Sequence, residues 1–237
     1  MRAFIAGATG YTGRELVRVL RAADHDVTAH VRPDSRALPR WRADFGALGA
    51  RLDTTPWEGE ALASTLARVQ PTHVFALLGT TRKRMRADGV DRNTYEAVDY
   101  GLTSLLLRAT RAASPRARFV YLSSVGASEH GSAYLRARGR IERELRESGL
   151  SWIAARPAFV TGADREEARP AELIAGRTVD GFLRALALVG VRGPARRYGS
   201  LSGAALARAL AALAEDARDG VYDAAALRAA AEQVSRF

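Results

Sequence analysis

The chain has 237 residues, 47% of them hydrophobic and 26% charged, which excludes intrinsic disorder and allows one large domain with a substantial core. It contains no cysteine, which excludes disulfides, a thiolate nucleophile and cysteine-bound metal, and its four histidines lack the spacing of metal ligands, so we expect no metal site. The formal net charge is +10, but Lys83 is the only lysine among 36 basic residues, and the arginines are spread along the chain, so we expect no nucleic-acid partner.

Short apolar runs alternate with longer helical patterns through the first two thirds of the chain. Residues 12–23 place Leu16 and Leu20 on one helical face, and residues 93–113 repeat that periodicity, with Val98 and Leu102 on one face. This alternation predicts an α/β fold, a Rossmann-like doubly wound parallel sheet with helices on both faces. The predicted strands are residues 2–6, 27–31, 50–52, 73–78, 118–122 and 152–155.

After Pro157 the pattern loosens. A polar stretch covers residues 162–170, and helical segments are predicted around 181–189 and 203–217. A last short strand is predicted over residues 220–222. Asp223 is predicted to be the N-cap of a terminal helix over residues 224–234. We expect residues 1–237 to form a single domain, in which about 160–237 form a small C-terminal region that covers the substrate cleft.

The N-terminal residues indicate a strand and a turn rather than a signal peptide. No apolar run approaches the ~18 residues that a membrane span needs. We therefore expect no membrane partner and a cytoplasmic location. The sequence leaves the oligomeric state open between monomer and homodimer.

A glycine-rich turn, Gly7-Ala8-Thr9-Gly10-Tyr11-Thr12-Gly13, follows the first predicted strand directly and opens into the first helix. Without Cβ atoms the main chain can approach a pyrophosphate closely, and the helix N-terminus offers N–H groups and a positive dipole end. Strand, glycine triplet and helix in this order predict a nicotinamide dinucleotide site, whereas the alternative is a turn that needs glycine only for its geometry. The residues predicted to bind the cofactor here are Gly7, Thr9, Gly10, Tyr11, Thr12 and Gly13.

The end of the second strand indicates which nucleotide is bound. An NAD-binding protein usually places an Asp or Glu there on the ribose 2′-hydroxyl. This chain has Arg32, which can stack on adenine and pair with a 2′-phosphate, helped by Arg14 or Arg36. NADP(H) is therefore favoured, although Asp34 keeps NAD(H) as an alternative. Asp53, after the third strand, is predicted either to accept a bond from the adenine amino group or to be a plain turn aspartate.

The Gly-x-x-Gly-x-x-Gly spacing resembles the extended and atypical short-chain dehydrogenase/reductases. Over residues 1 to about 175 the chain is similar to their Tat-interacting oxidoreductase branch and its bacterial NAD(P)H-binding relatives. The segments that match are Leu77-Leu78-Gly79-Thr80-Thr81-Arg82, Val98-Asp99-Tyr100, Tyr121-Leu122-Ser123-Ser124, Tyr134 followed by Gly139 and Glu142, and Arg156-Pro157.

This resemblance implies a place for each end of the cofactor. Thr9 to Gly13 would hold the pyrophosphate and Arg32 the adenosine side. Leu78, Gly79 and Thr80 would contact the nicotinamide ribose, and residues 156–160, with Pro157 and Val160, would line the nicotinamide pocket. Simpler explanations exist for some of these residues, because a parallel strand must turn at its end and a proline ends a strand whatever the function.

The resemblance also implies a reaction centre. Tyr134, at the head of a helix, would exchange a proton while a hydride passes between the nicotinamide and a carbonyl, and Ser124, with Ser123 as the fallback, would fix the carbonyl oxygen. The family pattern is Tyr-x-x-x-Lys, but Arg138 occupies the lysine position. One helical turn brings Arg138 beside Tyr134, where its charge favours the ionised phenol and its donors could bond the ribose. Arginine does not readily release a proton, which puts a relay through it in doubt.

We therefore predict an NADP(H)-dependent oxidoreductase that acts on a small carbonyl or alcohol substrate, with Tyr134, Arg138 and Ser124 at the reaction centre. The alternative is a catalytically weak NADP(H)-binding redox sensor or protein-interaction module. In that case the family lysine was replaced by Arg138 because catalysis had been lost.

Overall fold

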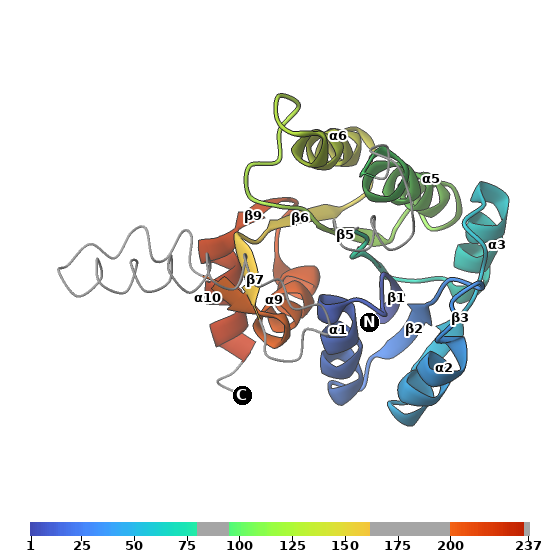
Figure 1. The fold of residues 1–237 in the computed structure, drawn as a ribbon. Helices are drawn as coiled ribbons and strands as arrows, with labels where there is room; N and C mark the ends of the chain where they lie inside the picture. Colours follow the sequence, from blue (N-terminus) through green and yellow to red (C-terminus); the bar gives the residue numbers. More distant parts are fainter. Residues whose placement is uncertain (80–94, 162–199, 235–237) are drawn as a thin grey trace.

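A seven-stranded parallel sheet forms the centre of the computed structural model, which describes residues 1–79, 95–161 and 200–234 (Figure 1). The strand order is β3-β2-β1-β4-β5-β6-β9, and every neighbouring pair is parallel. The strands are β1 (Arg2–Ala6), β2 (Asp26–His30), β3 (Arg51–Asp53), β4 (His73–Ala76), β5 (Arg118–Leu122), β6 (Trp152–Arg156) and β9 (Gly220–Asp223).

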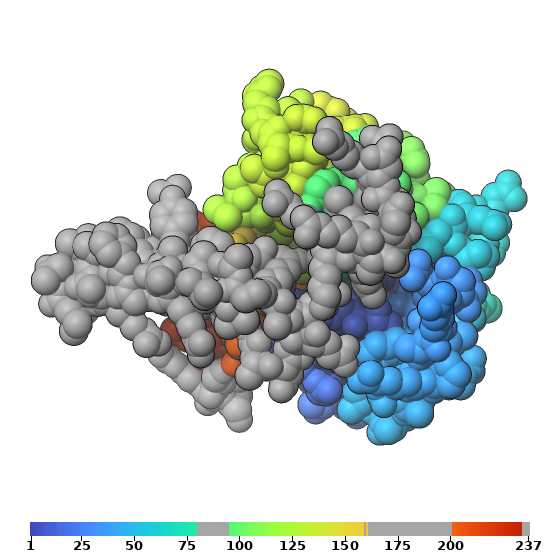
Figure 2. Space-filling view, viewed as in Figure 1, coloured from blue at the N-terminus to red at the C-terminus, as the bar shows by residue number. Residues whose placement is uncertain are grey.

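Helices cover both faces of this sheet (Figure 1). One layer consists of α1 (Tyr11–Ala22), α2 (Leu38–Ala47), α9 (Gly203–Asp216) and α10 (Ala224–Val234). The other consists of α3 (Gly59–Val69), the π-helix η1 (Tyr95–Leu102), α5 (Thr103–Ala113) and α6 (Ala133–Glu147). In the space-filling view the blue N-terminal elements and the yellow-green α6 lie on opposite sides of the face shown (Figure 2).

The alternation of side chains along each strand builds a core on each face of the sheet. In β1, Ile5 packs into the cluster that contains Leu16 of α1, whereas the neighbouring Phe4 packs into the cluster that contains Leu106 of α5. All four side chains are fully buried. A strand segment buried on both faces must be apolar on both, which is why β1 is continuously apolar from Ala3 to Ala6 and does not alternate, whereas its first residue, Arg2, is exposed.

The chain changes direction across the sheet next to β1. It runs outward from β1 to β2 and β3, then crosses to the other side of β1 for β4 and continues outward to β5, β6 and β9. The loops after β1 and β4 therefore lead away from each other at the carboxyl edge. In open α/β sheets a ligand binds in the crevice that such a reversal creates.

The predicted Rossmann-like α/β fold is confirmed, and its strands begin and end within two residues of the predicted bounds. The predicted last strand is also confirmed as β9, and Asp223 Oδ1 caps α10 by accepting bonds from the N–H groups of Ala225 (3.1 Å) and Ala226 (3.0 Å). The predicted segments at residues 162–170 and 181–189 lie outside the described residues.

Two features differ from the expectation. The predicted single helix over residues 93–113 is a π-helix, η1, followed by α5 in the described part. A second, two-stranded parallel sheet pairs β7 (Phe159–Thr161) with β8 (Ser200–Ser202), and strands of three residues are too short to give a periodic signal.

None of the helices in the described ranges combines the length and the apolar character needed to cross a membrane.

Candidate functional site

The glycine-rich turn lies where the sheet reverses direction. Gly7 has a φ of +85°, and a Cβ there would lie 2.6 Å from the carbonyl oxygen of Leu77, just after β4. A Cβ on Gly13 would lie 2.2 Å from the carbonyl oxygen of Gly7. These two glycines are therefore needed for the close packing of β1, β4 and α1, which places the turn between the ends of β1 and β4.

The first turn of α1 has the properties of an anion site. Gly10 is the N-cap residue, so no side chain caps the helix, and the first turn contains no acidic residue. The N–H of Gly10 bonds the Gly7 carbonyl at 3.0 Å and closes the turn. The positive end of the helix dipole thus faces the crevice without a carboxylate of its own to neutralise it. Of the other turn residues, Thr9 is half-buried and Thr12 is buried.

Tyr11 joins this turn to the C-terminal part of the chain. Its ring lies directly against Gly203, the first residue of α9, where a Cβ would come within 2.4 Å of the ring atom Cε1. The β8–α9 junction, which begins with the Ser202 N-cap, therefore borders the glycine turn.

At the end of β2, Arg32 extends into solvent with 59% of its side chain exposed, and its Nη1 lies 3.8 Å from Asp34 Oδ2. Asp53 is buried at the end of β3, and its carboxylate accepts bonds from the N–H (3.1 Å) and the hydroxyl (2.9 Å) of Thr55. His30 donates through Nε2 to the Thr55 carbonyl, and burial lowers the pKa of its imidazole. The structure thus gives Asp53 a turn-stabilising role, whereas Arg32 is accessible to a ligand.

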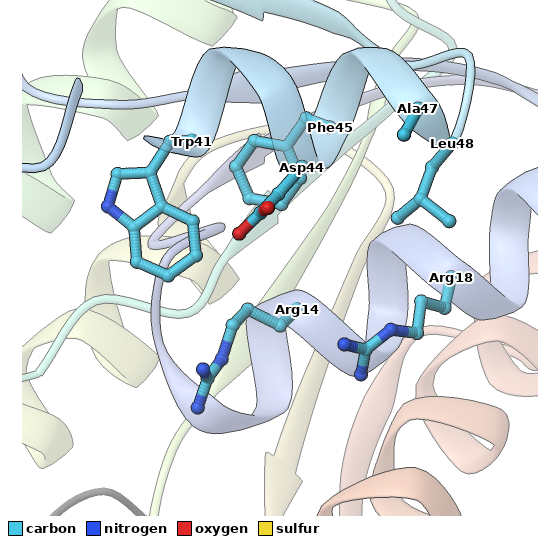
Figure 3. Close-up of a pocket in the computed structure, with 7 residues that line it drawn as sticks. All are labelled: Arg14, Arg18, Trp41, Asp44, Phe45, Ala47 and Leu48. Carbon is cyan, nitrogen blue, oxygen red and sulfur yellow. The ribbon is translucent and has the colours of Figure 1, made fainter. Parts of the chain in front are cut away.

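A pocket of about 270 Å³ lies between α1 and α2 (Figure 3). Arg14 and Arg18 of α1 face Trp41 and Asp44 of α2 across it. The guanidinium carbon of Arg14 lies 5.9 Å from the centre of the Trp41 ring, within the range of a cation–π contact. Arg14 therefore lies one residue beyond the glycine turn with its charge against an aromatic face.

The two serines after β5 have different surroundings. Ser123 is buried, and its hydroxyl donates to Glu142 Oε1 at 2.6 Å, while Glu142 also accepts from Arg156 Nε at 2.8 Å. Ser124 is half-buried, and its hydroxyl donates to the carbonyl of the adjacent Val125 at 3.2 Å. Ser124 is therefore the serine whose hydroxyl can turn to a ligand, because Ser123 is held in a buried ionic network.

The strand ends on that side of the crevice come from β4, β6 and β7. Leu78 and Gly79 follow β4, whereas Thr80 lies outside the described residues. Pro157 is buried after β6, and its carbonyl accepts the N–H of Val125 at 3.1 Å, which ties it to the loop that contains Ser124. Val160 is half-buried in β7.

Tyr134 and Arg138 come together on α6, one turn apart. Tyr134 is the second residue of the helix, and its ring packs edge-on against Tyr95 with 5.5 Å between ring centres. The guanidinium carbon of Arg138 lies 5.0 Å from the Tyr134 ring centre. Arg138 is only 5% exposed, and it donates to the carbonyls of Leu122 and Leu78, the latter at 3.3 Å. The guanidinium is therefore bonded to the main chain at the ends of β5 and β4.

Sequence reasoning gave no role to Asp99, which the structure pairs with Arg138. The carboxylate is fully buried, and its Oδ1 lies 2.7 Å from Arg138 Nη2. Helical periodicity placed Val98 and Leu102 on the buried face, but in the π-helix Asp99 is buried while these two are half-buried. A wider helix changes which positions face inward, so a count of 3.6 residues per turn cannot find this residue.

The doubly wound sheet, and the glycine turn at its point of reversal, define a dinucleotide-binding protein of the Rossmann class. Residues 7–181 match the family model described as NAD(P)H-binding. The chain therefore belongs to the NAD(P)H-binding family, and it has a nicotinamide nucleotide as its cofactor. This confirms the predicted similarity to NAD(P)H-binding proteins, while the short-chain dehydrogenase/reductase superfamily and its Tat-interacting branch stay predictions.

Known proteins similar to this chain include fungal relatives and enzymes solved in complex with NAD. It is 34% identical to protein fmp52-1 of Aspergillus terreus and 35% identical to protein fmp52 of Aspergillus clavatus, covering in each case 75% of this chain and 74% of the relative. Among solved structures, Thermus thermophilus UDP-glucose 4-epimerase in complex with NAD has a TM-score of 0.65 at 18% identity, covering 100% of this chain and 84% of that one. The Bordetella bronchiseptica enzyme WbmH in complex with NAD+ also has a TM-score of 0.65, at 15% identity and 94% and 74% coverage. At these identities the two structures bear on the fold alone.

The predicted cytoplasmic location is wrong by this comparison. All seven curated relatives are named mitochondrial proteins. The expectation rested on the strand-like pattern of the first residues and on the short length of the apolar runs, and neither pattern distinguishes among compartments inside a cell.

Proposed function

We propose that this chain is an NADP(H)-dependent oxidoreductase that transfers a hydride between the nicotinamide and a small carbonyl or alcohol. The observation that supports this most is the environment of Arg138, which bonds the main chain at Leu78 and Leu122 and lies 5.0 Å from the Tyr134 ring centre. Tyr134 is therefore beside the carboxyl ends of β4 and β5, the edge at which parallel sheets bind ligands. A phenol at that edge is suited to exchange a proton with a bound substrate.

The residues at the turn fit a dinucleotide. The absence of a Cβ at Gly10 leaves the main chain open to a pyrophosphate, and the first turn of α1 has no acidic side chain to repel it. Gly79, which follows β4, is exposed and would meet the nicotinamide ribose with its main chain. These features come from two separate parts of the chain and meet at one edge of the sheet.

The reaction divides between the cofactor and three side chains. When bound, the reduced nicotinamide supplies a hydride to the carbonyl carbon. The Tyr134 hydroxyl gives its proton to the carbonyl oxygen, which becomes the alcohol, and Ser124 holds that oxygen by a hydrogen bond. The fixed charge of Arg138 stabilises the phenolate left behind. In the oxidation direction each transfer is reversed.

The C-terminal part completes the proposed site. Residues from about 160 onward would cover the substrate side, as the packing of α9 against α1 and of Gly203 against Tyr11 suggests. We propose that one domain of residues 1–237 contains both the cofactor site and this cover.

A preference for NADP(H) is proposed from the basic residues around the end of β2 and the start of α1. Replacing Arg32 with alanine should weaken NADPH binding about ten- to hundredfold, because an arginine–phosphate bond is lost. NADH affinity should change by less than about threefold, since NADH has no 2′-phosphate. Titration of the purified protein with both nucleotides, followed by nicotinamide fluorescence, measures the two effects.

Arg51→Ala is the matched control for this titration. Arg51 is 60% exposed, close to the 59% of Arg32, but it begins β3 at the amino edge of the sheet and pairs with Asp26. It should leave both affinities as in the wild type. Equal loss of NADPH and NADH affinity in Arg32→Ala would contradict the proposed phosphate contact.

The contact between Gly203 and Tyr11 gives a test of the cover. A methyl group on Gly203 must displace the Tyr11 ring, so Gly203→Ala should lower the free energy of unfolding by about 1–3 kcal/mol. It should also weaken NADPH and NADH equally, because Tyr11 belongs to the turn that both share. Gly220→Ala is the control, since the nearest atom to its Cβ would be 3.8 Å away in Tyr222. If Gly203→Ala bound both nucleotides with wild-type affinity, α9 would not contribute to the cofactor site.

A second candidate function is a catalytically weak NADP(H)-binding redox sensor that acts by contacting another protein. It is favoured by the bonding of Arg138, whose guanidinium is bonded to main-chain carbonyls and to Asp99. The two functions differ in turnover. Oxidation of NADPH in the presence of a panel of small aldehydes and ketones supports the enzyme, whereas tight NADPH binding without any turnover supports the sensor.

A further inference from the structure

The ion pair between Asp99 and Arg138 is buried under the proposed nicotinamide site. Arg138 is 5% exposed and Asp99 is not exposed at all. A buried charge is costly unless it is paired and hydrogen-bonded, and this guanidinium has three acceptors around it: the Asp99 carboxylate and the carbonyls of Leu78 and Leu122. An arrangement with this many buried bonds fixes the guanidinium in one position.

The two carbonyls lie just beyond the last residue pair of the β4–β5 ladder. The ladder between β4 and β5 ends at the pair Ala76 and Tyr121, and beyond it β5 pairs only with β6, as far as Leu122 and Ala155. Leu78 and Leu122 thus follow the last β4–β5 pair. Arg138 joins them through its two terminal nitrogens and so sets the separation of the two strand ends.

The same guanidinium also borders the two groups that matter for the reaction. It lies 5.0 Å from the Tyr134 ring centre, and a Cβ on Gly79 would come within 2.8 Å of its Nη2. Movement of Arg138 would therefore shift the phenol and the Leu78–Gly79 turn relative to each other. A planar fork suits this role better than an ammonium, because it presents donors in fixed directions to separate acceptors.

Asp99 provides the anchor for this arrangement from a different element. It is the fully buried residue of η1, and its 2.7 Å bond to Nη2 aligns the fork with the two carbonyls. A second buried polar group, the Tyr121 hydroxyl, lies in the same cluster, and the guanidinium carbon of Arg138 is 5.6 Å from the Tyr121 ring centre. With the carboxylate removed, Arg138 would lose its paired charge inside this cluster and would be drawn toward the Tyr121 hydroxyl or toward solvent.

We propose that Asp99 is a positioning residue: it holds Arg138 beneath the ends of β4 and β5 and thereby sets the position of Tyr134 relative to the nicotinamide-binding turn. This inference rests on the proposed function, because it takes Tyr134 as the group that exchanges the proton. It assigns Arg138 a part in positioning and electrostatics, with no proton passing through it.

The test compares Asp99→Asn with the control Glu96→Gln. Glu96 pairs with Arg140 and so joins the same two elements, η1 and α6, but its side chain is 56% exposed. Asp99→Asn is expected to lower kcat at least about tenfold, with the KM for a carbonyl substrate within about threefold, because a small displacement of a reacting group costs rate more than binding. It should also weaken NADPH binding about fivefold or more by nicotinamide fluorescence. Glu96→Gln should match the wild type in kcat, in KM and in NADPH affinity.

A double variant, Asp99→Asn with Arg138→Gln, separates positioning from stability. It removes both charges, so its melting temperature should recover toward the wild type, whereas kcat should stay low. If Asp99→Asn alone does not fold, the kcat and NADPH affinity of the double variant are measured in its place. Wild-type kcat and NADPH affinity in Asp99→Asn, or recovery of kcat with stability in the double variant, would overturn the inference. If the wild type binds NADPH but turns over no carbonyl, the proposed function fails, and the NADPH affinity of these variants still decides the role of Asp99.

Discussion

Replacing Tyr134 with phenylalanine is expected to lower the rate of carbonyl reduction about 10²- to 10⁴-fold, the usual contribution of a positioned acid or base. The substitution removes only the hydroxyl. The ring keeps its contacts with Tyr95 and with the Arg138 guanidinium, so the fold of α6 and the strand ends should be preserved. NADPH affinity should therefore stay within about twofold of the wild type, since binding does not depend on the transferred proton. Steady-state assays of NADPH oxidation, alongside fluorescence titration, measure both quantities.

Tyr95→Phe is the matched control for this prediction. Tyr95 is half-buried, lies in η1 and touches the Tyr134 ring, so its variant makes the same chemical change next to the reacting group. It should retain the wild-type rate. If Tyr134→Phe also retained that rate, the proton would come from another group, and the proposed reaction centre would have to be abandoned. A loss of NADPH binding in Tyr134→Phe would instead indicate that the hydroxyl serves the cofactor.

The parts of the fold that were predictable are those set by local pattern. The continuous apolar run of β1, the glycine turn and the amphipathic α1 lie next to one another in the chain, and each follows from short-range steric rules. The cap at Asp223 is equally local, because the carboxylate bonds N–H groups two and three residues ahead. Once several such units alternate, a parallel sheet with helices on both faces is the packing that buries all their apolar faces.

The parts that were not predictable depend on contacts between distant residues. Whether Ser123 or Ser124 is available to a ligand depends on Glu142, 19 residues further on, which holds the Ser123 hydroxyl. The pairing of Asp99 with Arg138 spans 39 residues. No periodicity in the sequence encodes which of two adjacent serines meets a carboxylate on another element, nor that a π-helix will turn an aspartate inward.

The largest effect on the cofactor site is expected from Gly13→Ala. A Cβ at this position would lie 2.2 Å from the Gly7 carbonyl oxygen and 2.8 Å from Ala8 Cα. Both are main-chain atoms of the glycine turn, so no side chain can rotate away, and α1 must move off β1. We expect the free energy of unfolding to fall by about 1–3 kcal/mol, measured by urea denaturation. The affinity for NADPH and NADH should fall together by at least about tenfold, because the pyrophosphate contacts are common to both.

Gly46→Ala distinguishes this steric effect from a general effect of adding a methyl group. Gly46 lies in the last turn of α2, and nothing lies within 4 Å of the position of its Cβ. Because alanine restricts the unfolded chain and favours a helix, this variant should raise the free energy of unfolding by about 0.5–1 kcal/mol and leave both affinities unchanged. Both variants add one methyl group, but Gly13→Ala adds it against main-chain atoms and Gly46→Ala adds it in open space. Binding of either nucleotide at wild-type affinity by Gly13→Ala would show that the pyrophosphate does not lie against this turn, and the site would then have to be sought elsewhere along the carboxyl edge of the sheet.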